Sequence, residues 1–110
     1  MNTKQLGSSG VYVSEQIFGA WAIGGTYFLG AEDQQSIATI RAGIENGITT
    51  IDTAYIYGEG HSEQVVGEAI KGYDREQLTI ISKLWYNWMR QDLVETGADN
   101  SLKALGTDYM

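Results

Sequence analysis

Cysteine and proline are both absent from the 110 residues of this sequence. Without cysteine the chain can form neither a disulfide nor a thiolate metal site. Long apolar runs are missing too. None approaches the roughly 18 residues that a membrane span needs, and none follows the first five residues as in a secretory signal. We therefore expect a cytoplasmic protein.

Basic side chains are scarce. Seven Lys and Arg stand against fourteen Asp and Glu, which gives a formal charge of −7. Nucleic-acid binding depends on a basic face, and an anionic membrane surface repels an acidic protein. We therefore expect neither nucleic acid nor a membrane as a partner.

Hydrophobic periodicity and turn residues divide the chain into alternating strands and helices. The expected elements are a β-hairpin over 3–14, strands near 16–20 and over 48–53 and 78–83, helices over 32–46, 63–71 and 92–105, and the start of a fourth strand at 107–110. Ser62 is expected to be the N-cap of the second helix. The buried face of the third helix is expected to carry Val94, Ala98, Leu102 and Leu105.

A hairpin followed by β-α-β-α-β-α units indicates an α/β fold with a parallel sheet. The length of 110 residues fits a single domain, 1–110. Right-handed crossovers place the carboxyl ends of all the strands at one edge of the sheet. Active sites of such folds lie at that edge.

Three polar side chains are expected to meet there. Asp52 closes the second strand, Lys83 closes the third, and Tyr57 lies in the loop after Asp52. Because side chains alternate along a strand, Asp52 and Lys83 can both point inward. A lysine ammonium stabilises a neighbouring phenolate, so Tyr57 could act as a general acid toward a carbonyl oxygen. A purely structural Asp–Lys ion pair beside a partly buried tyrosine is the alternative.

Two other features admit competing interpretations. Residues 58–63, Gly-Glu-Gly-His-Ser-Glu, follow a strand and open a helix like a dinucleotide fingerprint. Glu63, however, places a negative charge where a pyrophosphate would sit, so we reject that hypothesis. His61 is interpreted as an exposed loop residue. The aromatic residues of the loop 84–91 either wall a pocket or pack beneath it.

Four segments resemble the aldo-keto reductase family: GAWAIGG at 19–25, IDTAYIYGEGHSE at 51–63, IISK at 80–83 and SLKALGTDY at 101–109. They occur in the family's order and spacing, and the likeness runs from about Leu6 to Met110. The sequence looks closest to the bacterial and potassium-channel-β-subunit-like branch. The resemblance implies a (β/α)8 TIM barrel, which needs about 250 residues. The chain is then a partial barrel, with the hairpin and about three βα units.

The resemblance also implies an oxidoreductase that uses NADP(H) to reduce small-molecule aldehydes or ketones. Asp52, Tyr57 and Lys83 match three members of the family's catalytic tetrad. The fourth, a histidine, lies beyond Met110 in the family's pattern, and His61 does not match it.

The same resemblance assigns binding of the nicotinamide end of the cofactor to Ala20, Trp21 and Asp52. Ala20 stands where a threonine is commoner in the family. The contacts to the adenosine phosphate belong to the second half of the barrel.

Three expectations follow for function. The first is an NADP(H)-dependent reductase, and the second is a nucleotide-binding regulatory subunit of the same superfamily. The third is that the 110-residue chain by itself is a truncated, inactive portion. Its open barrel edges would also favour self-association, because unpaired strand edges recruit other strands.

Overall fold

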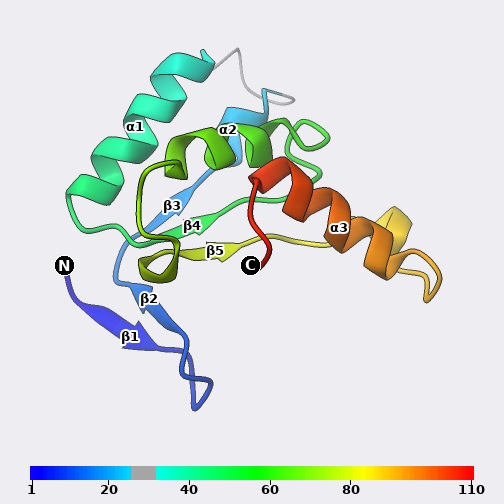
Figure 1. The fold of residues 1–110 in the computed structure, drawn as a ribbon, viewed down its shortest axis with the longest axis horizontal. Helices are drawn as coiled ribbons and strands as arrows, with labels where there is room; N and C mark the ends of the chain where they lie inside the picture. Colours follow the sequence, from blue (N-terminus) through cyan, green and yellow to red (C-terminus); the bar gives the residue numbers. More distant parts are fainter. Residues whose placement is uncertain (26–31) are drawn as a thin grey trace.

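The structure is a computed structural model that describes residues 1–25 and 32–110. Part of the loop expected after the first parallel strand therefore lies outside the described residues. A two-stranded hairpin precedes a three-stranded sheet, with one helix after each parallel strand (Figure 1). The α/β architecture expected from the sequence is confirmed as a partial barrel.

The strands are short and lie in two sheets. In the hairpin, β1 (Thr3–Gln5) pairs antiparallel with β2 (Tyr12–Ser14). The parallel sheet has the order β3-β4-β5, with β3 (Ile17–Gly19), β4 (Thr50–Asp52) and β5 (Thr79–Ile81). The helices are α1 (Asp33–Glu45), α2 (His61–Ile70) and α3 (Val94–Leu105), with 3-10 turns η1 (Ala22–Gly24), η2 (Arg75–Gln77) and η3 (Tyr86–Trp88).

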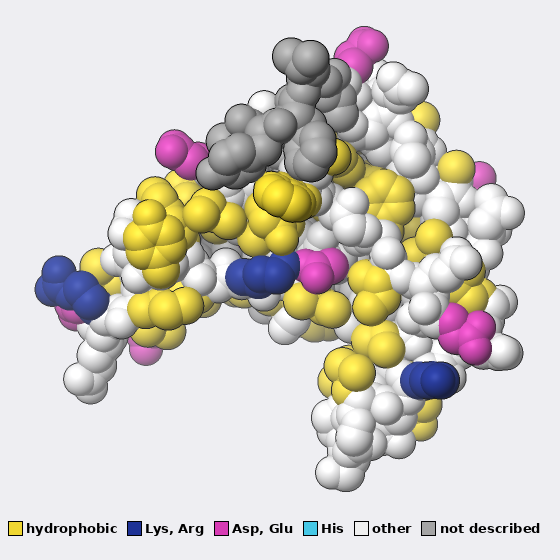
Figure 2. Space-filling model, turned by 180° about the vertical axis from the view of Figure 1, so that it is seen from behind, with side chains coloured by type: hydrophobic (Ala, Val, Ile, Leu, Met, Phe, Trp, Pro, Cys, Tyr) yellow, Lys and Arg dark blue, Asp and Glu magenta, His cyan; other side chains and the backbone are white. Residues whose placement is uncertain are grey.

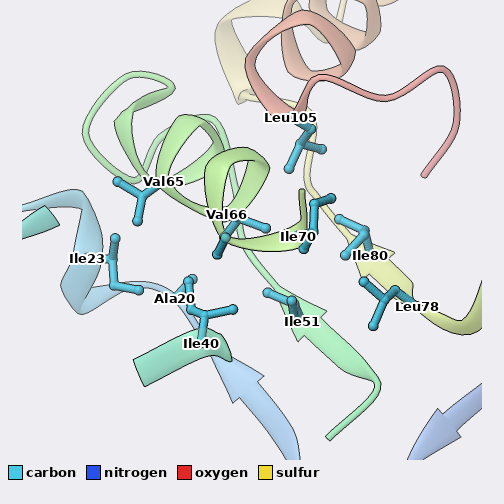
Figure 3. Packing of buried hydrophobic residues seen from close by; sticks show 11 residues of the cluster. Ala20, Ile23, Ile40, Ile51, Val65, Val66, Ile70, Leu78, Ile80 and Leu105 are labelled. Carbon is cyan, nitrogen blue, oxygen red and sulfur yellow. The ribbon is translucent and has the colours of Figure 1, made fainter. Parts of the chain in front are cut away.

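The hydrophobic core lies between the sheet and the helices, and α2 packs between α1 and α3 (Figures 1 and 3). Ile51 and Ile80 enter it from the sheet, Ile40 from α1, and Val66 from α2. Ile37 and Ile44 of the same helix are partly buried and pack against this core. Burying each such side chain stabilises the fold by about 1.5–3 kcal/mol, which fixes the helices on one side of the sheet.

The buried face of α3 includes Leu105, as expected, but otherwise differs from the expected one. Val94 is 43% exposed, while the buried residues are Gly97, Ser101 and Leu105. A Cβ at Gly67 of α2 would lie 2.6 Å from the Leu105 carbonyl oxygen. The two helices therefore approach closely through small residues, so an aliphatic stripe did not mark the contact.

The last four residues do not form a strand, so that prediction was wrong. Arg75 donates hydrogen bonds to Thr107 Oγ1 (3.0 Å) and to the Tyr109 carbonyl oxygen (2.7 Å). Its guanidinium also lies 4.0 Å from the centre of the Tyr109 ring. An arginine side chain, not a neighbouring strand, thus binds this segment. None of the helices within 1–25 and 32–110 is both long and apolar enough to cross a membrane.

Candidate active site

The ammonium group of Lys83 is the centre of the candidate site. Its Nζ contacts Asp52 Oδ1 in an ion pair and donates to the Thr53 carbonyl oxygen at 2.9 Å. It also donates to the hydroxyl of Tyr57 at 3.3 Å. The structure therefore brings together the three residues that the sequence singled out, and their catalytic roles stay predictions.

The register of the sheet explains why Asp52 and Lys83 meet. Asp52 pairs with Gly19 on one side and with Ile81 on the other. Lys83 lies two residues after Ile81, so it projects to the same side of the sheet as Asp52. Ile51, the neighbour of Asp52, points into the core. Asp52 and Lys83 therefore project away from the helices.

Tyr57 is placed by a close contact between two loops. A Cβ at Gly24 would lie 2.5 Å from the Tyr57 carbonyl carbon, and one at Gly58 would lie 2.3 Å from the Gly24 carbonyl oxygen. Gly58 also has a φ of +73°, which favours glycine. The loops after β3 and β4 thus meet backbone to backbone, and this contact holds Tyr57 beside Lys83.

The charge of Lys83 is maintained by its partners. Burial alone lowers the pKa of Lys83, but the hydrogen bonds and charges of Asp52 and Tyr57 raise it more. The net pKa of Lys83 therefore lies above the usual value of 10.5. A permanent cation consequently lies next to the phenol of Tyr57 at neutral pH.

The site lies on an open face of the molecule. The side chains of Lys83 and Asp52 are 47% and 38% exposed. Figure 2 shows a basic and an acidic side chain in contact near the middle of this view, with hydrophobic side chains around them. An oxygen atom of a small molecule could reach the phenol of Tyr57 from this side.

Of the three residues expected to bind the nicotinamide end, Ala20 and Trp21 differ in exposure. Ala20 is fully buried, and its N–H and C=O are bound to the Asp52 carbonyl oxygen and the Ser62 hydroxyl. Trp21 is 51% exposed, with its ring centre 6.4 Å from that of Tyr57. Trp21 therefore offers a surface beside the site, whereas Ala20 offers none. Both assignments stay predictions.

The start of α2 differs from expectation. Gly60, with a φ of +91°, is the N-cap, and the helix begins at His61. Ser62 therefore lies inside the helix, and its hydroxyl donates to the Ala20 carbonyl oxygen instead of capping the helix. His61 is therefore helical, not a loop residue, and its Nε2 lies 2.7 Å from Asp33 Oδ1.

The aromatic residues after Lys83 have separate roles. Trp85 and Tyr86 line a hollow of about 640 Å³ beside the loops after β3 and β4. Trp88 packs against Tyr55, with ring centres 4.5 Å apart, and against Gly97, where a Cβ would lie 3.0 Å from its ring. Two of them thus border open space and the third supports α3.

This fold and site define a class of α/β proteins with an Asp–Tyr–Lys cluster at the carboxyl ends of parallel strands. The aldo/keto reductase family model matches residues 16–110. The chain belongs to that family.

Two curated relatives illustrate the range of proteins to which the chain is similar. Over 119 residues the chain is 40% identical to the aldo-keto reductase YhdN of Bacillus subtilis, spanning all of this chain and 36% of YhdN. It is 32% identical to a probable voltage-gated potassium channel subunit beta of Arabidopsis thaliana, spanning all of this chain and 35% of that protein. The chain thus spans about a third of the length of these relatives.

Solved structures agree with the fold. The thermostable aldo-keto reductase Tm1743, crystallised with the inhibitor epalrestat, matches with a TM-score of 0.89 and 39% identity over all of this chain and 40% of its own. An aldo-keto reductase from Klebsiella pneumoniae in complex with NADPH matches with a TM-score of 0.76 and 39% identity, over 86% of this chain and 32% of its own.

Proposed function

We propose that the protein carrying this chain is an NADP(H)-dependent oxidoreductase that reduces aldehydes or ketones to alcohols. The observation that carries the proposal is that Lys83 Nζ contacts both Asp52 and the hydroxyl of Tyr57. Family membership and a relative crystallised with NADPH support it.

The residues of this chain are suited to hold the nicotinamide end of the cofactor. The ring of Trp21 is half-exposed and lies beside Tyr57, at the edge where the strands end. NADPH, when bound, supplies the hydride that is added to the carbonyl carbon. Ala20, Trp21 and Asp52 are the residues that we assign to its nicotinamide end.

Tyr57 supplies the proton that the reduced carbonyl group requires. Its hydroxyl donates the proton to the carbonyl oxygen, so the substrate leaves as an alcohol and a phenolate is left behind. Lys83 stabilises that phenolate by its positive charge, and Asp52 keeps the ammonium oriented. Solvent reprotonates Tyr57 before the next turnover.

Replacement of Tyr57 by Phe in the whole protein tests the assignment. Carbonyl reduction should fall by about 10²–10⁴-fold, the usual value of general-acid help, while NADPH binding is retained. Tyr73→Phe is the matched control, because it removes a hydroxyl that binds Glu45 away from Lys83. Near-normal turnover of the Tyr57→Phe variant would show that another group is the acid.

The similarity to a channel subunit favours a second candidate, a nucleotide-binding regulatory subunit. Steady-state oxidation of NADPH by the whole protein, measured with a panel of aldehydes, separates the two. Turnover that depends on the aldehyde supports the reductase. Stoichiometric NADPH binding without turnover on any aldehyde favours the regulatory subunit.

A further inference from the structure

We propose that Ser62 and Glu63, in the first turn of α2, are positioning residues that clamp the ends of β3, β4 and β5 and thereby place Asp52 and Lys83. Both residues are fully buried, with 0% of their surface exposed. The catalytic part of this inference rests on the proposed function. The structural part does not.

Ser62 ties two strand ends together. Its Oγ donates to the Ala20 carbonyl oxygen at 2.8 Å, and it lies 2.9 Å from Thr53 Oγ1. A serine hydroxyl can donate only one hydrogen bond. Because Ser62 donates to the Ala20 carbonyl oxygen, Thr53 must be the donor in the bond between the two hydroxyls. Ala20 directly follows β3 and Thr53 directly follows β4.

Glu63 holds the third strand end. Its Oε1 accepts a 2.6 Å hydrogen bond from Ser82 Oγ, and Ser82 directly follows β5. The helix dipole favours an acidic side chain in this first turn. The other oxygen, Oε2, is buried without a hydrogen-bond partner among the described residues.

The clamp acts on the site through the alternation of side chains. Thr53 adjoins Asp52 and Ser82 adjoins Lys83, and neighbouring side chains of an extended chain point to opposite faces. Thr53 and Ser82 therefore meet α2 while Asp52 and Lys83 project to the open face. A shift of Ser82 moves Lys83 with it, and a misplacement of about 1 Å can cost 10²-fold in rate.

Substitutions in the whole protein that remove or retain the acceptor test the clamp. Glu63→Met and Ser82→Ala should each lower kcat about 10- to 100-fold, with KM changed little. Glu63→Gln keeps an oxygen acceptor and should restore turnover. The double variant should be no worse than either single one, because the two side chains act as one contact.

Matched controls lie on the same helix. Glu68→Met and Glu68→Gln make the same changes at a residue whose side chain is 57% exposed. Both should retain turnover. If Glu63→Met does not fold, Ser82→Ala, which removes only a hydroxyl, decides the question.

A second readout does not depend on activity. The titration of Lys83, followed by NMR of 13Cε-labelled lysine, reports its contact with Asp52. Glu63→Met and Ser82→Ala should move this titration down toward the usual lysine range, while Glu63→Gln and the Glu68 variants should not.

The outcomes are distinguishable. If the wild-type protein reduces no carbonyl, the proposed function fails and the Lys83 titration alone judges the clamp. If the Lys83 titration is the same in the wild type, Glu63→Met and Ser82→Ala, the clamp is refuted whatever the activity. The clamp would also be refuted if Glu63→Met and Ser82→Ala lowered the melting temperature but left kcat and the Lys83 titration unchanged. Glu63 would then have only a structural role.

Discussion

At the scale of single residues, the contacts of Lys83 decide how the site responds to pH. Its ammonium contacts Asp52 and the hydroxyl of Tyr57, and these two partners raise the pKa of Lys83 although burial lowers it. A lysine whose pKa lies above 10.5 stays protonated near neutral pH. Lys83 itself therefore contributes no pH dependence to turnover around pH 7.

The raised pKa of Lys83 predicts a change of stability in alkali. Below the usual lysine value of 10.5 the group is charged in both folded and unfolded chains, and its stabilising contacts are fully present. Above that value the folded chain binds more protons than the unfolded one, so the free energy of unfolding must fall as the pH rises. Denaturant unfolding between about pH 9 and 11.5 should show this fall, and Lys83→Met should reduce its slope.

Lys103→Met is the control, since it removes an exposed lysine of α3. It should leave the alkaline slope of the wild type in place. An equal slope in the wild type and in Lys83→Met would show that the ion pair with Asp52 does not stabilise the fold.

Asp52, Tyr57 and Lys83 could be predicted from the sequence because strand alternation and the position of strand ends are local properties. The roles of Ser62 and Glu63 could not. Ser62 precedes a helical stretch and matches an N-cap, and Glu63 matches a surface charge. Their partners Ala20 and Ser82 are distant in sequence, so their roles appear only when α2 packs on the sheet.

At the scale of elements, the loops after β3 and β4 behave as one unit. Gly24 and Gly58 let their backbones meet where any side chain would collide. The positive φ of Gly58 adds a second requirement for glycine. The position of Tyr57 is thus determined by two glycines in separate loops rather than by its own hydrogen bonds alone.

Gly24→Ala should separate these loops. Its Cβ would lie 2.5 Å from a backbone carbon of Tyr57, so the free energy of unfolding should fall by about 1–3 kcal/mol, as for an overpacked core. Turnover should fall as well because Tyr57 moves. Thermal unfolding and steady-state kinetics of the whole protein measure both effects.

Gly43→Ala in α1 is the matched control, since its Cβ would make only ordinary contacts of 3.5 Å or more. It should keep or raise stability, because alanine favours a helix by about 0.5–1 kcal/mol over glycine. If Gly24→Ala proves as benign as Gly43→Ala, the loop contact does not position Tyr57.

The order of elements was predictable because each helix and strand carries its own hydrophobic period. The bounds at the start of α2 and the contact face of α3 were not. The first depends on a left-handed Gly60, and the second on close approach at Gly67. Both are consequences of helix packing, which hydrophobic spacing along one helix does not record.

At the scale of the whole molecule, the described residues form one side of a barrel. In the three-stranded sheet, β3 and β5 are the edge strands, and edge strands are templates for pairing. Self-association of the 110-residue polypeptide through these edges stays a prediction, as does its inactivity. Light scattering that shows a monodisperse monomer would contradict the first.

The cations of the chain are poorly placed for a dinucleotide. Many are already engaged by carbonyl or carboxylate oxygens of the chain itself, namely Arg41, Lys71, Arg75, Lys83 and Arg90. The formal charge of −7 also repels a polyanion. The described residues therefore offer the phosphates of a dinucleotide few free positive charges.

Residues 1–110 alone should consequently bind NADPH only weakly. A charge-assisted contact to a phosphate contributes about 1.5–3 kcal/mol, and the absence of two or three weakens binding by several powers of ten. We expect no saturation below about millimolar NADPH when the fluorescence of Trp21, Trp85 and Trp88 is titrated, with the whole protein as the control. Saturation at micromolar NADPH, together with alcohol formed from a simple aldehyde, would mean that copies of the polypeptide complete the site between them.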